Sequence, residues 1–160
     1  MKRLLIAAAL LLIALSCFAQ DKTPRLDFPL NGFSITPLEG TADSVTYQVL
    51  TVYLPPSGGF APNVSIQVQP HDGTMEEYLE ISKQQFETLK WTVIADSILT
   101  PTAITFEYSG IARGVALHFY AKAESRDGKV YLTTGASTED QWPNVSPRIK
   151  KCVNSFRFEE

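Results

Sequence analysis

The chain has 160 residues, with 14 lysines and arginines against 17 aspartates and glutamates and a formal net charge of −3. This length predicts one domain, and a hydrophobic fraction of 44% with 19% charged residues is ordinary for a folded globular protein. Because the sequence contains no basic run, it argues against nucleic acid and against an anionic membrane surface as partners.

The N-terminus has the three regions of an export signal. Met1–Arg3 is short and basic, Leu4–Leu15 is a continuous apolar run, and Cys17–Ala19 places small residues where signal peptidase reads them. A bilayer span needs about 20 apolar residues, and this run is shorter. The pattern therefore predicts a signal peptide over residues 1–19, cleaved before Gln20, and a protein exported to the periplasm or secreted.

Cys17 leaves a second outcome open. Ala14–Cys17 is close to a lipoprotein signal, in which a small or aliphatic pair precedes an acylated cysteine. The signal usually has leucine three residues before the cysteine, and here that residue is Ala14. Lipidation of Cys17 would anchor the protein to the envelope membrane. Cleavage after Ala19 would instead leave Cys152 as the one thiol, which cannot form an internal disulfide.

The first part of the mature chain is predicted to be a flexible leader over residues 20–30, followed by a short strand that begins at Phe33–Ile35. Residues 44–54 are rich in valine, threonine and tyrosine and predict a longer strand. Strict alternation places one set of its side chains on a common face: Val45, Tyr47, Val49, Thr51 and Tyr53. Pro55–Gly59 cannot continue a strand and is expected to form an exposed loop.

The clearest unit is a strand followed by a helix. Residues 63–69 alternate between apolar and polar side chains, which is the period of a half-buried strand, and Pro70–Gly73 is typical of a turn. Thr74 and Glu77 match a capping box at the start of a helix. A stripe at helical spacing predicts about four turns with one core-facing side: Met75, Leu79, Ser82, Phe86 and Leu89, flanked by Tyr78 and Ile81.

Four more strands are expected, over residues 92–99, 103–108, 115–124 and 129–135. Asp127-Gly128 is a hairpin signal between the last two. A terminal helix is expected to begin near Ser137. It has an apolar stripe made of Trp142, Val145, Ile149, Cys152 or Val153, and Phe156. Pro147 lies inside this stripe, so it either kinks the helix or begins its main part with Ser146 as the cap.

This order of elements predicts an α+β fold. Consecutive strands that are joined by short turns pair antiparallel, and two amphipathic helices need a sheet to cover. We therefore expect a single, mostly antiparallel sheet of about six to seven strands with two main helices packed on it.

Four stretches, in this order and spacing, carry a family resemblance: Pro62–Val68, Met75–Leu79, Val130–Thr133 and Val153–Phe156. The chain resembles the PsbP-like superfamily over residues 31 to 158, and we place the domain at residues 31–160. This group includes the PsbP proteins of photosystem II, a nuclear-import factor that binds a small GTPase, and DcrB-like bacterial lipoproteins. The resemblance implies an α/β/α sandwich around an antiparallel sheet. It also implies a binding or assembly module, with no family catalytic motif to carry over.

Histidine chemistry is the alternative that the sequence leaves open. His71 and Asp72 could act as an acid/base pair or bind a metal, and His118 could do so from the outer face of a strand. We favour a structural role for each, because polar residues are the norm in turns and nothing identifies a ligand for His118. The sequence has no Gly-x-Ser-x-Gly elbow and no cysteine–histidine cluster with zinc spacing.

We therefore expect a non-catalytic binding or assembly module of the bacterial cell envelope, with no cofactor, no metal and no catalytic residue. Its partner would be an unidentified envelope protein, with membrane contact only if Cys17 is lipidated. Four aromatic residues are the candidate interaction surface: Tyr47, Tyr53, Phe60 and Tyr120. The alternative is a small envelope hydrolase or metal-dependent enzyme that uses His71 and Asp72, or His118.

Overall fold

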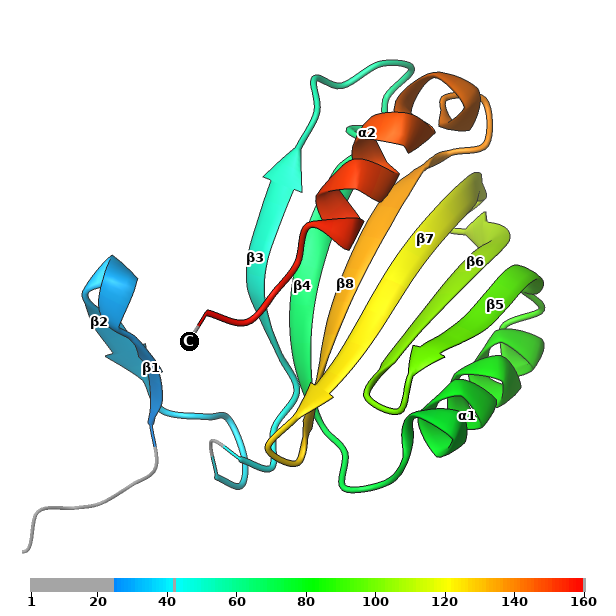
Figure 1. Ribbon diagram of the computed structural model, residues 1–160. Helices are drawn as coiled ribbons and strands as arrows, with labels where there is room; N and C mark the ends of the chain where they lie inside the picture. Colours follow the sequence, from blue (N-terminus) through cyan, green and yellow to red (C-terminus); the bar gives the residue numbers. More distant parts are fainter. Residues whose placement is uncertain (1–24, 42, 160) are drawn as a thin grey trace, which may run out of the picture.

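The computed structural model describes residues 25–41 and 43–159 (Figure 1). The expected signal peptide, Cys17 and the first part of the leader lie outside these residues. Within the described part, the elements in chain order are β1 (Leu26–Phe28), a 3-10 turn (Pro29–Asn31), β2 (Phe33–Ile35), β3 (Tyr47–Tyr53), β4 (Asn63–Pro70), α1 (Met75–Thr88), β5 (Thr92–Thr100), β6 (Ala103–Ala112), β7 (Val115–Arg126), β8 (Lys129–Thr138) and α2 (Trp142–Asn154).

The main sheet has six strands in the order β3-β4-β8-β7-β6-β5, and every neighbouring pair is antiparallel. β1 and β2 form a separate antiparallel hairpin. The α+β class and the antiparallel sheet predicted from the sequence are confirmed. β3 and β5 are the two edges of the main sheet.

The two helices cover opposite faces of the main sheet. On β7, Phe119 and Ala121 pack in the core that α1 covers, whereas Tyr120 packs against α2. Because successive side chains of a strand point to opposite faces, α1 and α2 must lie on different sides. Figure 1 shows α2 lying in front of the sheet over β4 and β8, and α1 beside the β5 edge. The fold is thus an α/β/α sandwich.

The capping box of α1 forms as predicted. The backbone N–H of Glu77 donates to Thr74 Oγ1 at 3.1 Å, and the Thr74 N–H donates to Glu77 Oε2 at 2.9 Å. Most of the predicted stripe is buried, together with Tyr78. Leu89 and Ile81 are exposed instead. Leu89 caps the end of α1, where its N–H still donates to the Gln85 carbonyl at 3.0 Å, and Ile81 lies within the helix outside the buried stripe.

Two strand predictions need correction. Residues 26–28 of the expected leader form β1, and Phe28 stacks on Phe33 of β2 with ring centroids 4.9 Å apart. In β3, a bulge between Gln48 and Leu50 shifts the register against β4. An extra residue in one strand reverses the faces of the residues that follow it. The single alternating face expected for residues 45–53 was therefore wrong.

The terminal helix begins later than expected. β8 continues to Thr138, and α2 starts at Trp142 with Pro143 in its first turn, where a missing N–H leaves no bond unmade. The helix runs through Pro147, so the interpretation in which it starts there was wrong. α2 lies close against β8, since a Cβ on Gly135 would sit 2.1 Å from Ile149 Cγ2.

Candidate functional site

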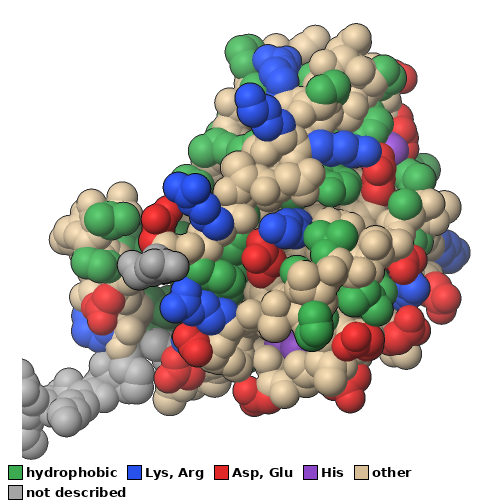
Figure 2. All heavy atoms as spheres, viewed as in Figure 1, with side chains coloured by type: hydrophobic (Ala, Val, Ile, Leu, Met, Phe, Trp, Pro, Cys, Tyr) green, Lys and Arg blue, Asp and Glu red, His purple; other side chains and the backbone are tan. Residues whose placement is uncertain are grey.

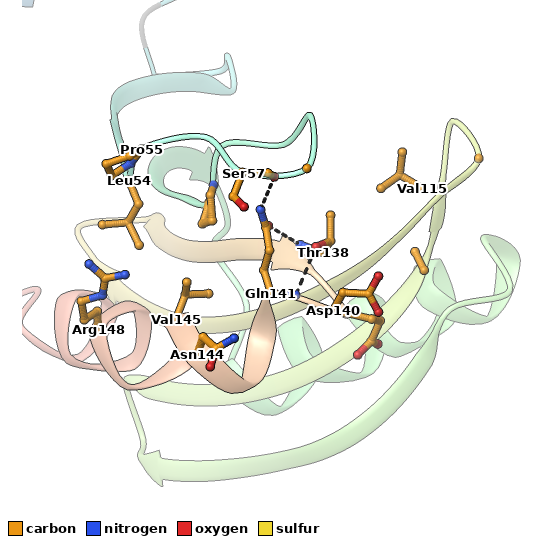
Figure 3. A pocket seen from close by; sticks show the side chains of 15 residues that line it. Leu54, Pro55, Ser57, Val115, Thr138, Asp140, Gln141, Asn144, Val145 and Arg148 are labelled. Atoms are coloured by element: carbon orange, nitrogen blue, oxygen red, sulfur yellow. Dashed lines mark hydrogen bonds between the residues drawn. The ribbon is translucent and has the colours of Figure 1, made fainter.

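An open groove of ≈ 730 Å³ lies where the β3–β4 loop meets the start of α2 (Figure 3). It is lined by residues from the loop after β3, from the β6–β7 turn and the start of β7, and from the end of β8 through the start of α2: Leu54, Pro55, Ser57, Gly58, Pro62, Gly114, Val115, Ala116, Thr138, Glu139, Asp140, Gln141, Asn144, Val145 and Arg148. The loop that begins with the predicted Pro55–Gly59 segment therefore forms one wall.

Gln141 fastens this loop to α2. Its side-chain amide donates to the carbonyl oxygens of Ser57 at 2.6 Å and Phe60 at 3.1 Å, and its Oε1 accepts from the Thr138 N–H at 3.2 Å. The loop is also closed on itself, because the backbones of Ser57 and Phe60 exchange two hydrogen bonds. The groove is thus shaped by bonds within the chain before any ligand arrives.

The lining combines apolar and charged groups. Leu54, Val115 and Val145 contribute apolar surface, while the amide of Asn144 can both donate and accept. Arg148 and Asp140 lie on opposite sides of Asn144 and Val145 in Figure 3. One end of the groove is therefore basic and the other acidic. Such a lining suits a ligand that offers both apolar contacts and hydrogen-bonding groups.

A cluster of charged side chains adjoins the groove and shares Glu139 with it. The His118 Nε2 lies 2.8 Å from Glu107 Oε1, and its Nδ1 lies 3.1 Å from Glu139 Oε2. Lys150 Nζ donates to Glu107 Oε2 at 2.8 Å. The ring of Trp142 stacks on the imidazole with centroids 4.0 Å apart. The cluster thus joins β6, β7 and α2.

The environment of Glu107 favours its charged form. Burial acts to raise the pKa of this carboxyl, but the hydrogen bonds from Lys150 and His118, together with their charges, outweigh burial, and the pKa lies below its ordinary value. Both nitrogens of His118 are directed at carboxylates, and Trp142 covers its ring. The arrangement fastens α2 to the sheet and leaves no ring nitrogen facing the groove.

The four predicted surface aromatics do not share one cavity. Tyr47 faces the β1–β2 hairpin, with its ring 6.2 Å from that of Phe28. Tyr53 is exposed at the end of β3. Phe60 is half-buried and reaches the groove site through its carbonyl bond to Gln141. Tyr120 lies beneath α2, where its hydroxyl donates to Asn154 at 3.0 Å. As an interaction surface, this set stays a prediction.

His71 and Asp72 lie in the turn before α1. The His71 ring bonds the Thr74 carbonyl through Nε2 at 2.9 Å and contacts Tyr78, while Asp72 is exposed. Among residues 25–41 and 43–159, no group of three or more histidine, cysteine, aspartate or glutamate side chains could hold a metal ion.

Cys152 is exposed and borders a small hollow beside β3.

Sequence reasoning missed the residues that make the groove and the cluster. Gln141 follows two acidic residues before a helix, so it resembles an ordinary helix start. Glu107 and Lys150 are 43 positions apart and show no shared periodicity. The one sequence signal that pointed to the groove was the Pro55–Gly59 segment, which the sequence identifies as an exposed loop.

The part of the chain that the structure describes contains no helix that is both long and apolar enough to cross a membrane.

Figure 2 shows basic side chains over α2, whereas acidic side chains gather at the lower right, over α1.

No family model matches the chain, and no curated protein matches it. Among solved structures, a protein of unknown function and putative regulator, PA94 from Pseudomonas aeruginosa, superposes with a TM-score of 0.62 at 15% identity, covering 86% of this chain and 99% of that one. Cyanobacterial PsbP from Synechocystis sp. has a TM-score of 0.48 at 14% identity, covering 78% of this chain and 98% of that one.

LpqN, involved in cell envelope biogenesis of Mycobacterium tuberculosis, has a TM-score of 0.42 at 11% identity, covering 71% of this chain and 83% of that one. At these identities the likeness concerns the fold, and a shared fold does not define a function.

Proposed function

We propose that the protein is an exported, non-catalytic binding or assembly module of the bacterial cell envelope. Its groove between the Leu54–Pro62 loop and the start of α2 would receive a polypeptide segment of a partner protein. The observation that carries this proposal is the anchoring of the loop by Gln141, because a wall fixed in advance lowers the ordering cost of binding.

The lining supports a polypeptide as the ligand. A peptide backbone offers a donor and an acceptor at every residue, and the groove presents matching groups in the Asn144 amide and the polar side chains near it. The apolar residues give contact area for side chains, and the opposite charges at the two ends fix the direction of the bound segment. An open groove also admits a segment that continues past the site at either end.

The hydrolase alternative finds less support in the geometry. His118 has carboxylates at both ring nitrogens and an indole over its face. His71 holds a main-chain carbonyl within its own turn. A general base needs a ring nitrogen within reach of a substrate proton. Turnover of a substrate from a hydrolase panel, lost in His118→Ala or in His71→Ala, would overturn the non-catalytic proposal.

Export is the second part of the proposal, and it rests on the basic start and apolar run of residues 1–15. Intact-mass measurement on the protein from the native envelope tests it. A chain beginning at Gln20 fits cleavage after Ala19, and a chain beginning with acylated Cys17 fits a lipid anchor. A chain that retains Met1–Ala19 would contradict export by this signal.

The groove is tested by cross-linking the protein in its native cell envelope, pulling it down and identifying partners by mass spectrometry. Arg148→Glu reverses the charge of one groove end, and Lys151→Glu is the matched control on an exposed position of the same helix. We expect one abundant partner that Arg148→Glu loses and Lys151→Glu keeps. Equal recovery by both variants would contradict binding in the groove.

A further inference from the structure

The two edges of the main sheet are protected to different degrees. An edge strand offers unpaired N–H and C=O groups to other chains, and proteins block it with charges, bulges or a covering element. β5 has two bulges, α1 beside it, and Asp96 in an ion pair with Lys83 at 3.2 Å. β5 also exposes apolar side chains, namely Ile94 50%, Ile98 48% and Leu99 51%. The two edges therefore differ in the charge on β5 and in the number of bulges, and not in apolar exposure.

β3 has much less protection. No charged residue occurs from Tyr47 to Leu54, the strand has one bulge, and among the described residues no strand pairs with its outer side. Four neighbouring apolar side chains are exposed on it: Val49 46%, Leu50 47%, Val52 43% and Tyr53 67%. An uncharged, apolar edge of this kind favours pairing with an additional strand.

Residues 50–53 of β3, whose outer edge is unpaired among the described residues, lead directly to the groove. Leu54 follows the strand and lines both the groove and a small hollow that Val52 and Tyr53 also border. Arg148 of α2 lines both spaces as well. At the other end of the strand, Tyr47 faces the β1–β2 hairpin through Phe28. A segment that pairs with residues 50–53 therefore continues into the groove.

We propose that an extended segment of the partner protein adds to the sheet as a seventh strand along the outer edge of β3 and runs on into the groove. This inference rests on the proposed function and names how the partner binds. The segment would be uncharged where it faces Leu50–Tyr53, with apolar side chains at alternate positions, because cross-strand pairs of that kind stabilise a sheet.

A second copy of the chain fits this edge less well. Two β3 strands that pair antiparallel would bring the Tyr47 end of one copy to the Leu54 end of the other. The β1–β2 hairpin lies at the Tyr47 end of β3 and packs beside Tyr47. In such a dimer the hairpin of one copy would therefore approach the groove of the other copy, where a single extended strand is expected. An isolated segment enters the groove without this obstacle.

The probe for this proposal is a displayed library of random decapeptides, panned against the wild type, Leu50→Lys and Ile98→Lys. Leu50 and Ile98 are matched, since they are 47% and 48% exposed on opposite edges. We expect the wild type and Ile98→Lys to retain peptides with alternating apolar residues. Leu50→Lys should bind those peptides roughly tenfold more weakly or worse, because a charge on an edge opposes pairing. Val52→Lys serves as a second variant if Leu50→Lys does not fold.

Amide hydrogen exchange with a retained peptide identifies the surface. Strand addition predicts slower exchange for residues 49–54 as well as around the groove. Protection confined to residues 138–148, with equal affinity for Leu50→Lys, would overturn strand addition and leave groove binding in place. No retained peptide would overturn both proposals. A concentration-dependent dimer whose β3 amides are protected without peptide would assign the edge to a second copy and also overturn the proposal.

Discussion

The side-chain amide of Gln141, at the start of α2, donates to the main-chain carbonyl of Ser57 at a distance of 2.6 Å. The two residues are 84 positions apart, and Phe60 accepts a second bond from the same nitrogen at 3.1 Å. One side chain therefore joins both walls of the groove. Since main-chain carbonyls are the acceptors, the link depends on Gln141 and not on the side chains of the loop.

Gln141→Ala should free the loop without unfolding the protein. Each hydrogen bond contributes about 1 kcal/mol, so we expect a small fall in stability and faster amide exchange at residues 57–60. Hydrogen exchange by mass spectrometry checks this, with Gln84→Ala on the exposed side of α1 as the control. Unchanged exchange at residues 57–60 would show that the loop is held by its own turn alone.

Gly135→Ala should destabilise the packing of α2. The added Cβ would lie 2.1 Å from Ile149 Cγ2, and overpacking of this kind costs about 1–3 kcal/mol. Ile149→Ala alone should cost about 2–5 kcal/mol because it leaves a cavity. The double variant should lose less than the sum of the two, since each change makes room for the other. Urea denaturation of the three variants measures this, and simple additivity would contradict the close contact.

The architecture was largely predictable from the sequence because it depends on local patterns. Alternating residues predicted the strands, and Thr74 with Glu77 predicted the start of α1. The β3 bulge was not predictable, because its position is set by pairing with β4. The start of α2 was misplaced because Ser137, a plausible cap, lies buried in β8.

The site was much less predictable than the fold. The Pro55–Gly59 loop has a strong local signal, but the partner of that loop, Gln141, is selected by the tertiary structure. His118 was placed on the outer face of its strand, and the helix that covers it there contributes Trp142 and Lys150 to the cluster. Contacts between residues so far apart leave no periodicity in a single sequence.

Glu107→Gln should show how the charged cluster stabilises the fold. The pKa of Glu107 is lowered, so its contribution is complete above the ordinary carboxyl value of 4.5 and is lost as the pH falls through the folded-state pKa. At pH 7 the variant should be about 2 kcal/mol less stable than the wild type, because Lys150 and His118 lose a charged acceptor.

The difference between the two proteins should shrink as the pH is lowered below 4.5. Denaturant unfolding at a series of pH values measures it, with Glu87→Gln on an exposed position of α1 as the matched control. A difference that stays constant down to acid pH would mean that the charge of Glu107 does not contribute.

Cys152 offers a reporter beside the groove. It is exposed and borders the hollow that Val52 and Arg148 also line. In a chain with Cys17→Ser it is the one remaining thiol, so maleimide labelling reports on this position alone. Bound partner or retained peptide should slow labelling of Cys152, while a cysteine introduced at Thr88 of α1 should label at an unchanged rate. Equal rates with and without ligand would contradict occupancy of the hollow.

The most direct test of groove binding is photo-cross-linking in the native envelope. A photoreactive amino acid replaces Asn144 inside the groove, and in a control protein it replaces Gln84 on the far helix. The proposal predicts one dominant protein adduct from position 144 that is absent from position 84, with the cross-link mapping to a single extended segment of the partner. Equal adducts from both positions, or none from position 144, would contradict the groove as the binding site.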